Sequence, residues 1–154
     1  MRIRVPAVAF ALLLVAAGLP GRSRAEDASN AGIKVEITGL RNNNGRIGCS
    51  LWAGPEGFPR DDSHIKKHVW APIKNANSEC SFKGAFPAGD YGVTLFHDED
   101  NSGKFKTNMI GYPLEGYGFS NNVVPMFKAP SFDDCKFHYD GTGWKQISVK
   151  MIYR

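Results

Sequence analysis

The chain has 154 residues and a formal net charge of +4, with 42% hydrophobic and 22% charged residues. This length fits one domain and is too short for a barrel enzyme or a two-domain dehydrogenase. Ten Phe, five Tyr and three Trp residues can supply a hydrophobic core, which excludes a chain that is disordered throughout.

The basic charge is concentrated at the start of the chain. Residues 1–25 contain four arginines and no acidic residue, so the rest of the chain has 15 basic and 15 acidic side chains. Nucleic-acid binding needs a surplus of cations that displaces counterions from phosphates, and a polybasic membrane patch needs a similar surplus. The composition therefore predicts no nucleic-acid partner and no polybasic membrane patch.

The start of the chain has the pattern of a secretory signal peptide. Arg2 and Arg4 precede an apolar run over residues 5–19, and Ser23 and Ala25 place small residues at positions −3 and −1 of a cleavage site. The alternative is a membrane anchor, but the run has about 15 residues and spanning a bilayer takes ~20.

These features predict three segments. Residues 1–25 are a signal peptide, residues 26–32 a polar and flexible N-terminus, and residues 33–154 the exported domain. We expect this domain to be periplasmic or extracellular, without a stable membrane anchor.

Alternating apolar and polar residues predict short strands along the exported domain. In chain order they cover residues 33–38, 46–53, 69–73, 79–83, 91–97, 123–127, 132–137 and 144–153. The turn signal Asn42-Asn43-Asn44-Gly45 predicts that the first two strands form a hairpin, and Pro72 predicts that the third is an edge strand. One short helix is expected over residues 64–68. The fold class is therefore all-β, a single antiparallel β-sandwich of about seven or eight strands with at most one short helix.

Three cysteines remain after removal of the leader, and export makes a disulfide possible. Cys49 and Cys80 lie in strand-like segments, where neighbouring strands bring Cα atoms within the ~4.4–6.8 Å that a bridge needs. We predict a Cys49–Cys80 disulfide and expect Cys135 to be buried as a small hydrophobic residue.

The segment after the strand at 91–97 has the oxygen spacing of a calcium loop. Asp98, Asp100 and Ser102 occupy positions 1, 3 and 5, a glycine follows at position 6, and the carbonyl of Lys104 falls at position 7. Alternate oxygens at this spacing can converge on one hard cation.

Other features of this loop differ from an EF-hand. Position 12 is Met109 instead of a bidentate Glu, and no helices flank the loop. Glu115, Asp134 or backbone carbonyls would have to complete the shell. The alternative is a long turn in which Asp and Ser side chains bond their own backbone amides.

Two motifs at this end of the chain resemble those of a known family. Residues 97–104 read His-Asp-Glu-Asp-Asn-Ser-Gly-Lys, and residues 111–122 read Gly-Tyr-Pro-Leu-Glu-Gly-Tyr-Gly-Phe-Ser-Asn-Asn. With Gly-Phe-Pro at 57–59 and Pro-Ala-Gly-Asp-Tyr at 87–91, they resemble the small exported bacterial proteins called domain of unknown function 2141. The resemblance covers most of the chain after the leader, roughly residues 33–153.

The resemblance implies a transthyretin-like or immunoglobulin-like sandwich with no established activity. The chain differs from the family pattern at two loop positions. Asp100 stands where Asn is usual, and Lys106 stands where Asp is usual. The second difference removes a possible cation ligand.

Several other residues of the 97–122 segment are candidates for binding. His97 shares a strand face with Leu95, and we expect it to bond to the acidic loop and orient it. Exposed aromatic side chains on a glycine-rich loop can stack on sugar faces or anchor a protein partner, or they can cover the open end of a sandwich. The candidate binding residues are His97, Tyr112, Tyr117, Phe119, Asn121 and Asn122.

Two functions from different classes fit these features. The first is a non-catalytic module that binds a ligand, glycan or protein partner through residues 97–122, with calcium as a possible stabilising ion. The second is a small cation-dependent hydrolase that uses the acidic loop. We favour the first, because the chain offers one acidic cluster and that cluster is better placed for a cation or a turn than for paired acid–base chemistry.

Overall fold

The computed structural model describes residues 30–154. The predicted signal peptide and residues 26–29 of the predicted N-terminus lie outside these residues. Within residues 30–154, no helix is long and apolar enough to cross a membrane.

The described residues form eight strands and three helices of three or four residues. The strands are β1 (Gly32–Thr38), β2 (Arg46–Trp52), β3 (Lys67–Lys74), β4 (Asn77–Lys83), β5 (Gly89–Asp98), β6 (Tyr117–Phe119), β7 (Phe137–Tyr139) and β8 (Trp144–Lys150). The helices are η1 (Asp62–His64), η2 (Ser120–Asn122) and α2 (Phe132–Cys135). The predicted all-β class and the number of strands are confirmed.

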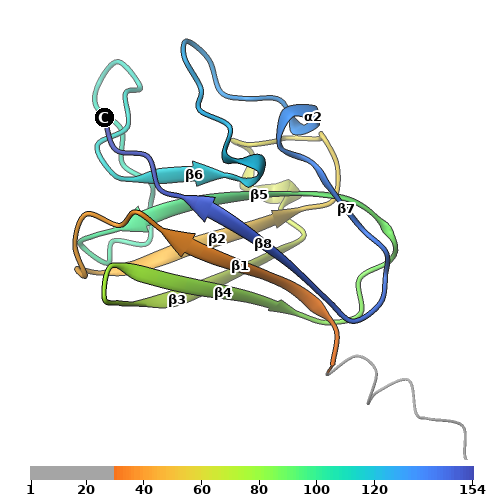
Figure 1. Ribbon diagram of the computed structural model, residues 1–154. Coiled ribbons are helices and arrows are strands. Elements are labelled where there is room, and N and C mark those ends of the chain that lie inside the picture. The colour runs from red at the N-terminus through yellow and green to blue at the C-terminus, as the bar shows by residue number, and fades with distance from the viewer. Residues whose placement is uncertain (1–29) are drawn as a thin grey trace, which may run out of the picture.

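The strands form one sheet that curls into a nearly closed cylinder (Figure 1). Their order is β6-β5-β2-β3-β4-β1-β8, and β7 pairs with β5 beside this path. The two ends of the sheet meet where Tyr117 in β6 exchanges backbone hydrogen bonds of 3.0 and 2.8 Å with Ile152, just after β8. The prediction of a two-sheet antiparallel sandwich is therefore corrected to one curled sheet, in which β1 and β8 are parallel.

The predicted first hairpin is wrong. β1 pairs with β4 and β8, while β2 pairs with β3 and β5. The alternation of apolar and polar residues predicts which face of each strand is buried, but it does not predict which strands pair. The connection between β1 and β2 has seven residues, and this length allows β2 to join another part of the sheet. The predicted edge strand, β3, instead lies inside the sheet between β2 and β4. It pairs with β4 over only Ile73 and Lys74, so Pro72 has no strand partner on the β4 side.

Three other local predictions are corrected. The helix expected over 64–68 is a single turn at Asp62–His64, and residues 67 and 68 already belong to β3. Residues 123–127 form no strand, and the strand expected over 132–137 divides into α2 and β7. A capping box explains α2: Ser131 Oγ accepts from Asp134 N, and Asp134 Oδ2 accepts from Ser131 N.

The core lies inside the cylinder and is built from alternate strand residues. Ile33, Val35 and Ile37 of β1 and Tyr91, Val93 and Leu95 of β5 are all buried, as their alternation predicts.

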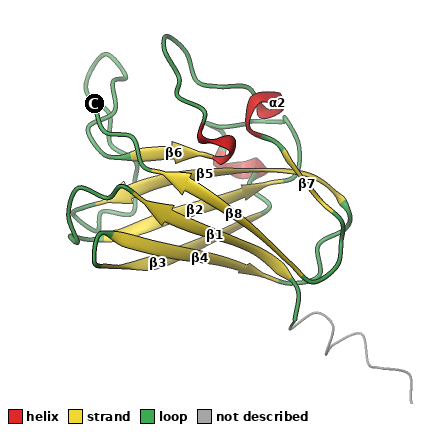
Figure 2. Cartoon of the chain, viewed as in Figure 1, coloured by secondary structure: helices red, strands yellow, loops and turns green. Residues whose placement is uncertain are grey.

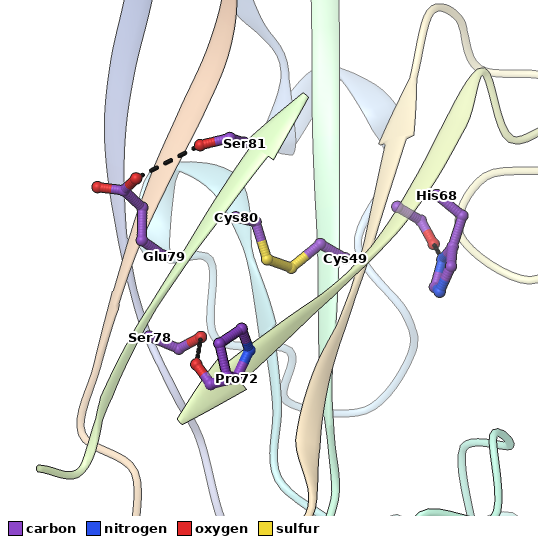
Figure 3. Close-up of a disulfide and its surroundings, with 8 residues drawn as sticks. Cys49, His68, Pro72, Ser78, Glu79, Cys80 and Ser81 are labelled. Carbon is purple, nitrogen blue, oxygen red and sulfur yellow. Dashed lines mark hydrogen bonds between the residues drawn. A yellow bond between two sulfur atoms is a disulfide. The ribbon is translucent and has the colours of Figure 1, made fainter. Parts of the chain in front are cut away.

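The disulfide crosses this interior (Figure 3). Cys49 in β2 and Cys80 in β4 are fully buried with their Cα atoms 6.6 Å apart, so the predicted pairing is confirmed. The expected reason is wrong, since β3 separates the two strands and the curl of the sheet brings the cysteines face to face. Cys135 is buried and free, as predicted. A disulfide fits an exported protein.

Candidate functional site

The candidate segment joins β5 to β6 at the end of the cylinder where the C-terminus lies. The loop over residues 99–116 rises beside β6, and a second loop over residues 123–131 rises next to it (Figure 2). Within the first loop, Thr107 and Pro113 form an isolated β-bridge, which folds the loop back on itself.

His97 is fully buried at the base of the loop and faces the interior, as its place beside Leu95 predicts. Its Nε2 lies 2.7 Å from the carbonyl of Asn44, which can only accept, so Nε2–H donates and Nδ1 accepts from the Tyr153 hydroxyl at 2.7 Å. Glu99 Oε1 lies 3.6 Å from Nδ1. His97 therefore joins the β1–β2 connection and the C-terminal segment to the start of the acidic loop.

Two glycines allow the chain to approach this base closely. Gly45 has a φ of +67°, and a Cβ there would lie 1.8 Å from the carbonyl oxygen of Asp98. A Cβ at Gly116 would lie 2.3 Å from the ring of Tyr153. Position 45 therefore requires glycine, whereas a side chain at position 116 would displace the ring of Tyr153.

Asp98 holds the start of the loop with a fully buried carboxylate. Its Oδ2 accepts hydrogen bonds of 3.0 Å from Arg46 Nε and from the backbone N–H of Gly103. The Arg46 guanidinium also stacks on the ring of Trp70, 3.7 Å from the centroid. The Asp98 carboxylate is therefore neutralised from within the fold.

The structure brings the five predicted cation ligands together. Carboxylate oxygens of Asp98, Asp100 and Glu115 all lie within 4.8 Å of one another. Ser102 Oγ lies 3.4 Å from Asp98 Oδ1 and 3.3 Å from the carbonyl oxygen of Lys104. Ligands at the ~2.3–2.6 Å distances of calcium lie up to about 5 Å apart across the ion, so this spacing fits a calcium shell. Asp134, the other acid considered, instead caps α2.

Lys106 supplies a positive charge to the same cluster. Its ammonium contacts Asp100 Oδ2, and its backbone N–H donates to Glu115 Oε2 at 3.0 Å. The hydrogen bond from Lys106 lowers the pKa of Asp100 to about 2. Burial raises the pKa of Glu115, and the charges of Asp98 and Asp100 add to this effect. A cation at this cluster would have to compete with the Lys106 ammonium.

The Ser-Asn-Asn end of the second motif connects three parts of the fold. Ser120 Oγ accepts from Val93 N at 2.9 Å and donates to the carbonyl of Cys135. Asn121 Nδ2 donates to the carbonyls of residues 134 and 136, at 3.1 and 2.9 Å. Asn122 Oδ1 accepts from Lys150 N at 2.7 Å. The side-chain amides of Asn121 and Asn122, two of the candidate binding residues, are thus hydrogen-bonded to backbone groups of the fold.

The sequence did not reveal a groove of about 1350 Å³ on the outer face of the sheet, between the two loops. Tyr112, Tyr117 and Phe119, three of the predicted binding residues, line it. Its floor is a row of edge-to-face rings with centroids 5.5 to 6.3 Å apart, formed by Trp70, Phe96, Phe105, Tyr117 and Phe119. One sequence feature could have indicated this row. Trp70 and Phe96 are aromatic residues at outward-facing strand positions, where an outer face is usually polar.

One family matches this chain. Residues 35–147 match the family described as "Uncharacterized protein conserved in bacteria (DUF2141)". The chain belongs to this family. The resemblance inferred from the two motifs is therefore confirmed. Neither a curated protein nor a solved structure matches the chain.

Proposed function

We propose that this member of the family is an exported, non-catalytic binding module, periplasmic or extracellular, which holds a glycan chain in the groove. The row of aromatic rings on the outer face of the sheet carries this proposal. Rings offer large, rigid surfaces that bind with little loss of conformational entropy, and five of them form the floor of the groove. Thr107 lines the same groove and offers an exposed hydroxyl for a hydrogen bond, whereas the hydroxyls of Ser50 and Thr94, also in the lining, already bond to His68 and Trp52.

In this proposal, the 97–122 segment forms one wall of the groove and must be held in place. His97, Asp98 and Ser120 are fully buried and fix the two ends of the segment to the fold. Calcium is a second candidate for this task, because the oxygens of the five predicted ligands converge at a suitable spacing. Calcium would act here as a stabilising ion.

The alternative of a cation-dependent hydrolase has less support. A catalytic carboxylate must reach the substrate, whereas Asp98 has no exposed surface and is paired with Arg46. Asp100 is occupied by Lys106. Glu115, whose pKa is raised by burial, is the group of this cluster best suited to hold a proton.

A calorimetric titration of the exported protein with soluble oligosaccharides tests the proposal. Phe105→Ala and Tyr112→Ala should weaken binding by at least about fivefold, since each removes a ring from the groove. Trp144→Ala is the matched control, because Trp144 lies outside the groove and is 40% exposed, against 42% for Phe105 and 43% for Tyr112. Equal losses in all three variants would contradict a groove site. Turnover of a glycan, ester or peptide that Asp98→Asn abolishes would favour the hydrolase.

A further inference from the structure

Exposed apolar side chains of residues 30–154 gather at one end of the molecule. Of the ten large hydrophobic residues that are exposed, nine lie in the groove or in the two loops beside it, and the exception is Trp144. The most exposed are Met109 at 104%, Phe127 at 97%, Ile110 at 88% and Met126 at 75%. Six of the nine line the same groove, and an exposed apolar patch of this kind marks an interaction surface.

These four residues belong to two loops, and Figure 1 shows the two loops rising from the β6 side of the cylinder. Met109 and Ile110 belong to the 99–116 loop, and Met126 and Phe127 belong to the 123–131 loop. Ile110, Met126 and Phe127 line the same groove, so the two loops lie on its rim together. We call these four residues the apolar tips.

The groove beside the apolar tips is strongly cationic. Within the described residues, Asp62 is the one acidic residue of its lining. Six basic residues line it: Arg60, Lys66, Lys67, Lys104, Lys128 and Arg154. Lys104 and Lys128 are exposed, and neither forms an ion pair within the described part of the chain. Outside residues 1–25 the chain has equal numbers of acidic and basic side chains. The fold therefore concentrates positive charge here that the overall balance conceals.

We propose that the apolar tips dock reversibly on an anionic lipid bilayer, with Lys104 and Lys128 facing the headgroup phosphates. A bilayer offers an apolar layer beneath an anionic surface, which suits exposed apolar side chains and unpaired lysines that belong to the same two loops. A soluble anion offers no apolar layer, and a neutral apolar surface leaves the cations without partners. This inference does not depend on glycan binding in the groove, and it describes peripheral contact rather than an anchor.

Sedimentation of the exported, processed protein with lipid vesicles tests the proposal. Its N-terminus is first checked by mass spectrometry, so that no apolar leader contributes. We expect binding to vesicles that contain phosphatidylglycerol, weaker binding to pure phosphatidylcholine, and loss of binding as salt increases. Phe127→Ser should weaken binding by about tenfold or more, since a phenyl side chain no longer enters the apolar layer. Lys128→Glu should weaken it by at least about fivefold.

Two matched variants control for general effects. Trp144→Ser removes an exposed ring, and Lys145→Glu reverses an exposed charge, both on β8 and outside the groove. Both should bind vesicles like the unmodified protein, and circular dichroism checks that every variant is folded. Equal binding to neutral and anionic vesicles, or unchanged binding of Phe127→Ser, overturns the proposal. Retention by a soluble acidic polysaccharide with no binding to vesicles also overturns it and assigns the cations to a glycan.

Discussion

The ammonium of Lys106 lies against the carboxylate of Asp100, inside the loop where the sequence predicts a cation site. Lys106 also fixes Glu115 through its backbone N–H. The motif resemblance leads us to expect Asp at this position, where this chain has Lys106. Lys106 offers no carboxylate to a cation and places a competing positive charge against Asp100.

We predict that Lys106→Asp strengthens calcium binding by about tenfold or more, because it removes the ammonium and adds a carboxylate. The unmodified loop should bind calcium weakly, in the roughly 10⁻⁴–10⁻³ M range of extracellular modules. Melting curves in chelator and in millimolar calcium measure the difference, since an ion that binds only the folded state raises its stability. In chelator the variant should melt below the unmodified protein, because its carboxylates repel one another.

Lys145→Asp, an exposed change on β8, is the control and should leave the calcium response unchanged. The stabilisation by calcium should disappear when Asp98→Ala is added to Lys106→Asp. A variant that responds to calcium no more than the unmodified protein would leave the loop as a self-bonded turn.

Local features of this molecule could be predicted from sequence, because local spacing determines them. The alternation of apolar and polar residues identified the buried faces of β1 and β5. Residues 98, 100, 102 and 104 belong to one short loop, so their oxygen atoms had to lie close together. Strand partners could not be predicted in the same way. β1 pairs with β4 and β8, and this depends on how the whole sheet curls.

The groove shows the same limit for the candidate site. Trp70, Phe96 and Phe105 come from three separate segments, and they form one row only after β3, β2 and β5 pair side by side. The Ser-Asn-Asn motif had a clear sequence signal but an ambiguous meaning. Asn121 and Asn122 adopt positive φ angles of 61° and 54°, which asparagine tolerates well, and their amides satisfy backbone groups.

We predict that Asp98→Ala destabilises the domain by about 2–4 kcal/mol, because it leaves the Arg46 guanidinium and the Gly103 N–H without their acceptor. Arg46 keeps about a third of its side-chain surface exposed, which limits the loss. Urea unfolding measures the effect. Asp90→Ala is the control: its partners His138 and Lys136 are exposed, so we expect a loss below about 1 kcal/mol. Similar losses of stability in both variants would show that the buried Asp98–Arg46 pair contributes no more to stability than an exposed pair.

We predict that replacing both bridge cysteines, Cys49→Ala with Cys80→Ala, lowers the free energy of unfolding by about 3–4 kcal/mol, because the bridge closes a loop with a sequence separation of 31 residues. Urea unfolding measures this loss.

The free thiol gives a separate prediction. Burial raises the pKa of the Cys135 thiol to about 12, so this thiol should not react with alkylating reagents in the folded protein. Non-reducing peptide mapping should find one bridge, and labelling should find one thiol only after unfolding. A bridge that contains Cys135 would contradict both expectations.

We predict that Asp100 and Glu115 give the stability of the loop opposite dependences on pH. The folded pKa of Asp100 is about 2, below its ordinary value of 3.8, so its stabilisation is present above pH 4 and is lost as the pH falls toward 2. The folded pKa of Glu115 is raised from 4.5, so its contribution is present below that pH and is lost as the pH rises through the folded value. Melting temperatures from pH 2 to 8 should therefore fall less steeply in acid for Asp100→Asn. Glu115→Gln keeps an acceptor for the Lys106 N–H and removes the charge, so it should remove the loss of stability that begins above the ordinary pKa of 4.5. If the Glu115→Gln profile runs parallel to that of the unmodified protein from pH 4 to 8, burial of Glu115 does not act on stability in this way.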